Sequence, residues 1–210
     1  MKIHDLTLTY DKNVAGFDTE PARLLERDGW NARTLHIYSH AGTHMDAPVH
    51  FGVSDATIDQ FKPEDFFSKR AWIVDLTGLG GSQLIELTEV LPQIPQFEKG
   101  DSLLLKTNWY QKLGTSEYRN ALPRISENLA HWMVKNEVKI VGVEPPSVAD
   151  VNNMVEVTLI HKILLGSVII VEGLCNLDKI KAKCVELIAL PLKIKDGDGA
   201  PCRVIAIEND

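Results

Sequence analysis

The stretch YSHAGTHMDAPVHF, residues 38–51, carries His40, His44, Asp46 and His50, four side chains of the types that bind metal ions. If the stretch were fully extended, His40 and Asp46 would lie ~20 Å apart at ~3.3 Å per residue. A metal ion is held at ~2 Å from each ligand, so an extended chain cannot bring these two residues to one ion. The chain must therefore turn back on itself between them.

The small residues of this stretch indicate how it turns. Gly42 supplies a permissive backbone between the first two histidines, and Pro48 stiffens the chain and restricts Ala47 to extended geometry. A helix would also bring positions four apart together, as in the zinc protease motif H-E-x-x-H. However, Ala41 stands where that motif has its glutamate, and Gly and Pro disfavour a helix. We therefore predict a strand that delivers His40 at its end and runs into a tight loop.

Imidazole and carboxylate ligands together suit Zn²⁺, Mn²⁺ or Fe²⁺, whereas Ca²⁺ and Mg²⁺ prefer mostly oxygen ligands. The stretch contains no cysteine, which argues against a purely structural zinc site. A mixed set of this kind usually leaves a position open for water, as catalytic sites do. Unrelated surface histidines are the alternative, but four ligand-type residues around a glycine and a proline favour a metal site.

A second half of the site is predicted in HKILLGSVIIVEGL, residues 161–174. Glu172 ends an apolar run that has the character of a buried strand, and His161 precedes that run. A buried carboxylate is costly unless it is paired or bound to a cation. We therefore predict that His161 and Glu172 join the first four residues. The alternative is a carboxylate that reaches solvent at the end of its strand.

Composition limits the class of protein. The chain has 210 residues, is 44% hydrophobic and 24% charged, and has a formal net charge of −7, so we expect one soluble domain over residues 1–210 and no nucleic-acid partner. The N-terminus lacks an apolar signal region, and nowhere do 18 uncharged apolar residues run together, which predicts a cytoplasmic protein without membrane contact. Cys175, Cys184 and Cys202 show no CxxC spacing and are predicted to be buried free thiols.

Strand-like and helix-like segments are mixed along the chain, which predicts an α/β fold of about eight strands and three or four helices. The helix of residues 125–137 is expected to be capped by Ser126. Three histidines are interpreted as structural: His131 on this helix, and His4 and His36, which are expected to be half-buried on strands. Strands are predicted at residues 2–10, 33–40, 70–78, 101–108, 138–144 and 167–174, with two more in 185–210 joined by the turn KDGDGAP, and a second helix at 156–166.

With these residues in view, HAGTHMDAPVHF resembles the H-x-G-T-H-x-D-x-P-x-H signature of the cyclase family of metal-dependent hydrolases, which includes bacterial kynurenine formamidases. The match is complete at every signature position. Similarity to the family extends over nearly the whole chain. It includes TIDQF, GTSEYRNALPRISENLAHWMV, GVEPPSV, HKILL through VEGLCNL, and the terminal ELIALPLKIKDGDGAPCRVIAI.

The resemblance implies a site and a fold. It implies one or two divalent ions, Zn²⁺ foremost and Mn²⁺ as the alternative, with five ligands: His40, His44, Asp46, His161 and Glu172. His50 would be the acid/base residue rather than a ligand, and Asp46 and Glu172 would be able to bridge two ions. The implied fold is a single compact α/β domain with a mixed sheet, of the swivelling β/β/α type. Members of the family commonly form homo-oligomers, so a dimer or tetramer is expected.

The implied reaction is hydrolysis of an amide by metal-activated water, with His50 taking the water proton and passing it to the leaving group. For an arylformamidase the substrate would be N-formyl-L-kynurenine and the products L-kynurenine and formate, a step of tryptophan catabolism. A non-catalytic metal-binding domain is the alternative from another class, but such a domain has no need of His50 beside its ligands.

Two departures from the formamidase pattern leave the substrate open. VAGFDTEPA, residues 14–22, stands where formamidases carry a W-P-G-D-T-like segment, and Phe17 is either a loose counterpart of that tryptophan or a core or interface aromatic. The later D-T-P-S stretch appears here as EPPS, residues 144–147. Both segments are expected to shape the pocket. Hydrolysis of a cyclic amide or a lactone, such as an isatin-type lactam, is therefore the main competing function.

Overall fold

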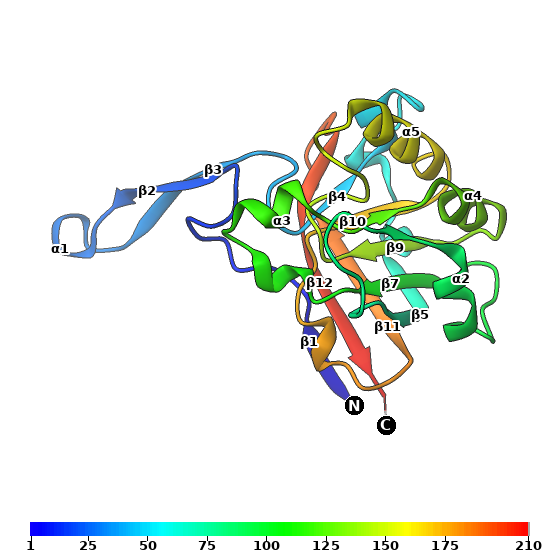
Figure 1. The fold of residues 1–210 in the computed structure, drawn as a ribbon. Coiled ribbons are helices and arrows are strands. Elements are labelled where there is room, and N and C mark those ends of the chain that lie inside the picture. Colours follow the sequence, from blue (N-terminus) through cyan, green and yellow to red (C-terminus); the bar gives the residue numbers. More distant parts are fainter. Residues whose placement is uncertain (210) are drawn as a thin grey trace.

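The computed structural model describes residues 1–209, in which a closed sheet carries helices on one side and a hairpin projects from the body (Figure 1). The strands are β1 (Lys2–Asp5), β2 (Phe17–Arg23), β3 (Ala32–Ile37), β4 (His44–Asp46), β5 (Phe67–Asp75), β6 (Leu84–Ile85), β7 (Ser102–Lys106), β8 (Arg124–Ile125), β9 (Ile140–Val143), β10 (Ile169–Glu172), β11 (Cys184–Pro191) and β12 (Gly199–Glu208). The α-helices are α1 (Leu25–Asp28), α2 (Leu87–Val90), α3 (Ser116–Asn120), α4 (Glu127–Lys135) and α5 (Met154–Leu164).

Eight strands form one sheet in the order β1-β12-β11-β5-β7-β9-β10-β4, and β4 also pairs with β12. This second pairing closes the sheet into a barrel at β4. Strands β5, β7, β9 and β10 are parallel to their neighbours in that run, whereas the other pairs of the sheet are antiparallel. The predicted α/β class with a mixed sheet is therefore confirmed.

Strands β7, β9 and β10 are buried on both faces, which explains their mostly apolar sequences. On β7, Leu103 and Leu105 pack in a core cluster with residues of α4 and α5, whereas Leu104 packs in the cluster inside the barrel. This alternation follows from the two-residue period of a strand. The helices α2, α4 and α5 lie together on the outer side of these strands (Figure 1).

The two predicted helices are present. The Ser126 side chain caps α4 by accepting a hydrogen bond from the Leu129 backbone N–H at 3.3 Å, as predicted. The second helix, α5, begins two residues before its predicted start because Asn153 caps it, accepting from the Glu156 N–H at 3.2 Å. Its last turn carries His161, which is buried.

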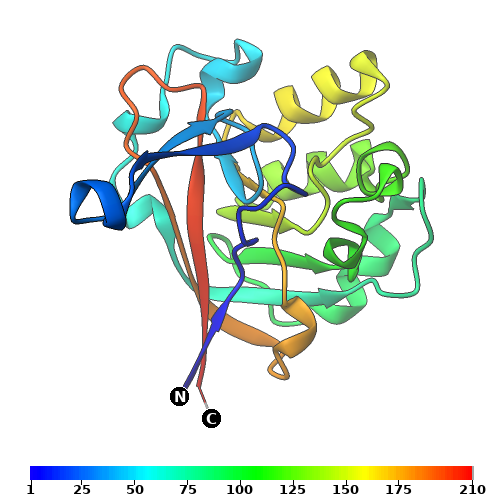
Figure 2. The ribbon, with the colours of Figure 1, turned by 90° about the vertical axis from the view of Figure 1, so that its left-hand side faces the viewer.

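The prediction that the strand of residues 33–40 ends at His40 is wrong. That strand, β3, ends at Ile37 and pairs with β2, and the two form a hairpin with α1 at its tip (Figures 1 and 2). We call residues 17–37 the arm. The arm projects from the body without a second layer, so His36, predicted to be half-buried, is exposed. The strand predicted at residues 2–10 is also shorter, since β1 ends at Asp5.

Three further observations concern the whole chain. The first and last strands pair, with Lys2 opposite Glu208, so the two ends of the described chain lie side by side (Figure 2). No helix within residues 1–209 is long and apolar enough to cross a bilayer. All three cysteines are free, as predicted, with Cys175 and Cys202 buried and Cys184 half-buried.

Candidate metal centre

Two glycines allow the chain to turn at the start of β4. Gly42 has φ +60°, and a Cβ there would lie 2.9 Å from the ring of Tyr10, whose hydroxyl donates to the Ala41 carbonyl at 2.6 Å. Gly173, which follows β10, has φ +69°, and a Cβ there would collide with the Gly42 carbonyl oxygen. L side chains rarely adopt such φ values. The glycines of HAGTH and VEGL therefore permit the close approach of the two loops.

The structure brings together all six residues predicted for the site. Strand β4 presents His44 and Asp46 on one face, since they are two residues apart, and β10 places Glu172 opposite His44. The nitrogen Nε2 of His44 lies 3.1 Å from Glu172 Oε2 and 3.6 Å from Asp46 Oδ1. From α5, His161 Nε2 lies 3.4 Å from Glu172 Oε1 and 3.6 Å from Asp46 Oδ2.

Backbone groups orient these side chains toward one another. His44 Nδ1 donates to the Gly42 carbonyl at 3.0 Å, and His161 Nδ1 donates to the Val157 carbonyl at 2.7 Å. A carbonyl only accepts, so each Nδ1 carries a proton, and Nε2 is the atom that would bind a metal ion once any proton on it is lost. The Val148 backbone N–H donates to Glu172 Oε1 at 2.7 Å. Such second contacts are typical of imidazole and carboxylate groups that bind metals.

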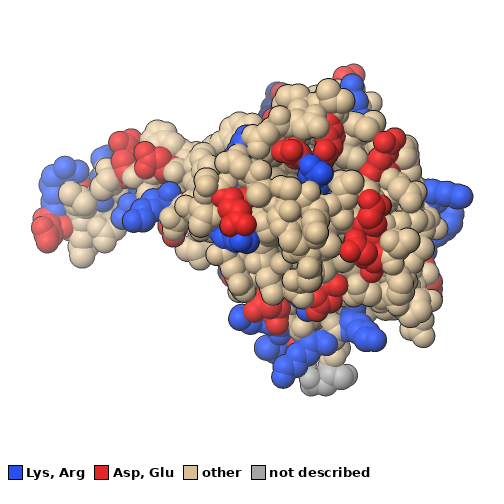
Figure 3. Space-filling view, in the orientation of Figure 1, with Lys and Arg blue, Asp and Glu red and all other residues tan. Residues whose placement is uncertain are grey.

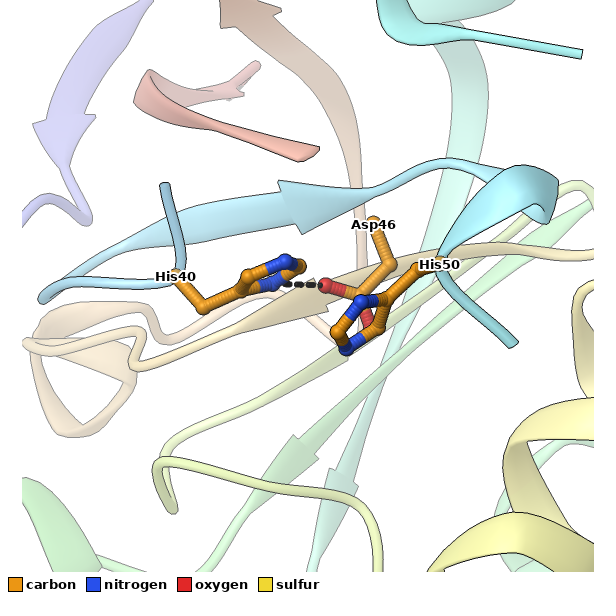
Figure 4. A group of neighbouring side chains, drawn as sticks. All are labelled: His40, Asp46 and His50. Carbon is orange, nitrogen blue, oxygen red and sulfur yellow. Dashed lines mark hydrogen bonds and ion pairs between the residues drawn. The ribbon is translucent and has the colours of Figure 1, made fainter. Parts of the chain in front are cut away.

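His40 and His50 also lie beside Asp46 (Figure 4). His40 Nδ1 is 2.8 Å from Asp46 Oδ1, and the two imidazole rings stack with centroids 3.9 Å apart at 25°. The ligand-type atoms of these three residues all lie within 4.8 Å of one another, as do those of His44, Asp46 and Glu172. Asp46 thus belongs to both groups.

The residues present fit a divalent cation. Asp46 Oδ2 is buried and has no hydrogen-bond partner, although a buried carboxylate oxygen without one is costly. Asp46 is 1% exposed and Glu172 is 3% exposed, so two carboxylates lie inside the protein. A cation at Asp46 would satisfy the unpaired oxygen, and the imidazole and carboxylate donors suit Zn²⁺ or Mn²⁺.

The pKa values of the cluster show how strongly it attracts positive charge. Burial lowers the pKa of His44 and His161, but the Glu172 and Asp46 carboxylates outweigh burial and raise both pKa values above the ordinary value. For His40, burial is likewise opposed by Asp46 and Asp198, which raise its pKa to about 9. Burial favours a neutral Glu172, yet His161 and His44 hold its pKa well below the usual range. Protons on the histidines or a metal ion can supply this charge.

His50 differs from these histidines. It lies in the 3₁₀ turn Pro48–Phe51 with its side chain 24% exposed, so its ring reaches the cavity. Burial and the neighbouring His40 lower its pKa below the ordinary value. A neutral imidazole near neutral pH is able to accept a proton.

A cavity of ≈ 580 Å³ opens onto the cluster. Apolar side chains from separate segments form part of its wall, among them Leu8, Val14, Leu113 and Val151. Polar side chains also line it, and Arg119 on α3 is the one Lys or Arg among the described residues that line it. The apolar side chains and Arg119 together suit a molecule that has an apolar part and an anionic group.

The two segments that depart from the formamidase pattern have different places. Phe17 does not line this cavity, and its ring packs edge-on against Tyr10 with centroids 5.3 Å apart. Ser147 lines the cavity, whereas Glu144 is buried beneath it and accepts hydrogen bonds from the Thr107 and Trp109 backbone N–H groups at 2.8 and 3.1 Å. Phe17 is therefore a packing residue in this chain, and Glu144 organises the turn after β7.

Sequence reasoning missed Asp198, in the turn that precedes β12. Its Oδ2 lies 3.0 Å from His40 Nε2 and 3.5 Å from His50 Nδ1. The turn KDGDGAP was recognised only as a connection between two strands. Its proximity to His40 depends on the pairing of β12 with β4, which no local pattern indicates.

Comparison with known proteins gives consistent results. The Cyclase family model matches residues 4–150. The chain is 30% identical over 189 residues to a kynurenine formamidase of Erythrobacter litoralis, covering 89% of this chain and 81% of that protein. It is 28% identical over 175 residues to one from Bacillus anthracis, covering 83% and 79%. Isatin hydrolase A from Ralstonia solanacearum has the same fold, with a TM-score of 0.89 and 22% identity over 99% of this chain and 92% of that one.

The family match covers more than half of the chain, and a relative at 30% identity covers most of it. The protein belongs to the cyclase family. Its signature residues are those that the structure gathers around Asp46.

Proposed function

We propose that the protein is an arylformamidase that hydrolyses N-formyl-L-kynurenine to L-kynurenine and formate, a step of tryptophan catabolism. More broadly it is a metal-dependent hydrolase that acts on C–N bonds other than peptide bonds. The observation that carries the proposal is the buried Asp46 oxygen without a partner, placed between four histidines and Glu172 at the base of the cavity. The kynurenine formamidase relatives over most of the chain support this substrate.

We assign the metal ligands as the signature implies. His40, His44 and Asp46 hold one ion, and His161 and Glu172 complete a second position, with Asp46 and Glu172 able to serve both. Zn²⁺ is the proposed metal, with Mn²⁺ as the alternative, because imidazole and carboxylate donors suit both. A bound divalent ion supplies a Lewis acid that lowers the pKa of water to about 7 and polarises the carbonyl.

His50 carries the proton through the reaction. Its neutral imidazole accepts a proton from the attacking water as the new C–O bond forms on the formyl carbon. The imidazolium then donates that proton to the aryl nitrogen as the C–N bond breaks, and formate and the free amine result. The apolar walls around Leu8, Val14 and Leu113 hold the aromatic ring and exclude bulk water.

Arg119 supports a substrate that bears a carboxylate. N-formyl-L-kynurenine carries an α-carboxylate at the end opposite its formamide, and Arg119 is the cation in the described lining of the cavity. A guanidinium pairs with a carboxylate through two parallel hydrogen bonds. A cyclic amide is the second candidate, because structures with the same fold over nearly the whole chain are isatin hydrolases.

The test is hydrolysis by the purified protein after chelation and reloading with Zn²⁺ or Mn²⁺. Formate release from N-formyl-L-kynurenine is followed beside isatin and an aromatic lactone. Metal-dependent formate release with a kcat/KM of about 10⁴ M⁻¹s⁻¹ or more would support the assignment. Turnover of the ring substrates alone would move the substrate to a lactam or lactone. No turnover of any substrate would favour a metal-binding domain.

We also propose that two or more copies associate through the arm. A two-stranded hairpin is marginally stable in water when nothing packs on it. The arm nevertheless exposes large apolar side chains, including Leu25 at 60%, Trp30 at 57% and Leu35 at 54%. A second copy would cover these groups, which a monomer leaves in water.

A further inference from the structure

The carboxylate of Asp198 faces two histidines at once. Its Oδ2 lies 3.0 Å from His40 Nε2 and 3.5 Å from His50 Nδ1. The rings of His40 and His50 are stacked, so one oxygen lies at the edge of both. The Asp198 side chain is 47% exposed, whereas His40 is 8% exposed, so the contact lies where the cluster opens to solvent.

The main chain holds Asp198 in this place. Its carbonyl accepts from the Ala47 backbone N–H at 2.9 Å, and the next residue, Gly199, pairs with Asp46 across the β4–β12 ladder. A Cβ on Gly199 would lie 2.6 Å from His40 Cε1, so the glycine lets the His40 ring lie against β12. The position of Asp198 thus follows from the closure of the barrel and does not depend on a flexible turn.

The chemistry of a carboxylate restricts both imidazoles. An ionised aspartate only accepts, so a ring nitrogen that pairs with it must carry a proton. On His40, Nε2 carries the proton that pairs with Asp198, whereas the proton that Nδ1 donates to Asp46 Oδ1 at 2.8 Å is the one that a metal ion bound there would displace. His50 Nδ1 lies 3.5 Å from the same oxygen, and a proton on Nδ1 would leave the lone pair of Nε2 free. One oxygen therefore selects opposite tautomers on the two rings.

We propose that Asp198 is a positioning residue that fixes these two tautomers. It leaves Nδ1 of His40 free for a metal ion and Nε2 of His50 free to accept a proton. The consequence for catalysis rests on the proposed function, since it takes His50 as the base of that reaction. The tautomers themselves do not depend on the substrate. No other described residue contacts both rings through a carboxylate.

The direct test is the tautomeric state of the histidines. Protein labelled with ¹⁵N-histidine is loaded with Zn²⁺ and examined by long-range ¹H–¹⁵N correlation spectra, with the signals assigned through His40→Gln and His50→Gln. We expect a proton on His50 Nδ1 and on His40 Nε2 in the native protein. In Asp198→Asn we expect the His50 signals to show a mixture of tautomers. Asp196→Asn is the matched control, because Asp196 is an exposed aspartate of the same turn with φ +56°, which asparagine tolerates.

Kinetics and zinc titration complete the test. At saturating Zn²⁺, Asp198→Asn should lower kcat about 100-fold, since general base catalysis contributes at least this much, while KM changes less than about threefold. Zinc affinity should fall about tenfold with the stoichiometry kept, as for other residues that orient a ligand. Asp196→Asn should match the native protein in each measurement.

Unchanged tautomers and kcat in Asp198→Asn would show that Asp198 is only a surface carboxylate of the turn. Loss of one zinc ion at saturation would show instead that it is itself a ligand. Either result overturns the proposal. If the native protein hydrolyses no amide, the proposed function fails, and the spectra and the zinc titration still decide the role of Asp198.

Discussion

Protonation of the three histidines nearest to Asp46 makes the metal affinity of the proposed site depend on pH. The pKa of His40 is raised to about 9, so its ring carries a second proton near neutral pH without a metal, and the carboxylates of Glu172 and Asp46 also raise the pKa values of His44 and His161. A metal ion must displace those protons. We therefore expect Zn²⁺ affinity to increase as pH rises from 6 toward 9, with protons released on binding.

Calorimetric titration in buffers of different ionisation enthalpy measures both quantities. The exposed His131, changed to alanine, is the control and should leave the pH dependence as it is in the native protein. An affinity that is constant across this range, or falls as pH rises, would contradict the charge balance described for the cluster.

A second expectation at this scale concerns His50. The change His50→Ala removes the proton acceptor but none of the proposed ligands. Metal content should remain at the native level, and kcat should fall about 100-fold or more. Metal analysis combined with formate release measures both. Full activity in this variant would remove His50 from the mechanism, and a large loss of bound metal would make it a ligand.

Arg119 is predicted to select the substrate. If its guanidinium pairs with the substrate carboxylate, Arg119→Ala removes a charge-assisted hydrogen bond worth roughly 1.5–3 kcal/mol, which raises KM about tenfold or more. The KM for formanilide, which has no carboxylate, should change little. Lys112→Ala is the control, because Lys112 pairs with Glu117 and does not line the cavity. Equal effects on both substrates would show that Arg119 only shapes the wall.

At the scale of elements, Glu144 links the end of β9 to the turn after β7. Its carboxylate is fully buried, and burial raises its pKa from 4.5 to about 7 despite hydrogen bonds from Thr107 and Trp109. Because the folded-state pKa is the higher one, its contribution to stability is complete below pH 4.5 and is lost as pH rises through 7. The loss amounts to roughly 3 kcal/mol at ~1.4 kcal/mol per pKa unit.

Urea unfolding at pH 5, 6.5 and 8 measures this contribution. Glu144→Gln keeps an acceptor for the same N–H groups without a titrating carboxyl, so its stability should fall less with pH than that of the native protein. The exposed Glu117, changed to glutamine, should behave as the native protein does. The same pH dependence in both variants would refute the prediction.

The elements also show what sequence alone was able to predict. His44 and Asp46 of β4 and the pair His161 and Glu172 were predicted to lie together because a dense motif, or a carboxylate at the end of an apolar strand, is a local signal. The strand predicted at residues 33–40 overlaps β3, but β2 was missed because the hairpin has one layer and no core face, so the polar sequence of β2 gives no burial pattern. Asp198 was missed because its role depends on strand pairing between distant segments.

At the scale of the whole molecule, the arm is expected to determine the oligomeric state. Replacing Trp30 with aspartate puts a charge into the proposed contact while leaving the body untouched. We expect this variant to be a folded monomer and the native protein to be a dimer or tetramer by sedimentation equilibrium. Leu84→Asp changes a residue on the body that is 39% exposed and is the control. A native monomer, or an oligomer unaffected by the Trp30 change, would refute this proposal.

The face of the molecule seen in Figure 3 shows acidic and basic side chains distributed among each other, on the arm as well as on the body. Such a surface lacks the broad basic area that a nucleic-acid backbone requires. The charges on this face therefore do not point to a nucleic-acid partner. A second copy of the chain remains the proposed partner for the apolar side chains of the arm.

The closure of the barrel at β4 has a consequence for biosynthesis. His44 and Asp46 are synthesised early. However, His44 pairs with Glu172 of β10, and His44 and Asp46 both pair with residues at the start of β12. The enclosed cluster therefore cannot form until the last strand has emerged from the ribosome. A motif that occupies a few consecutive residues can in this respect assemble only after β12 has been made, and stable capture of a metal ion there would have to wait for that strand.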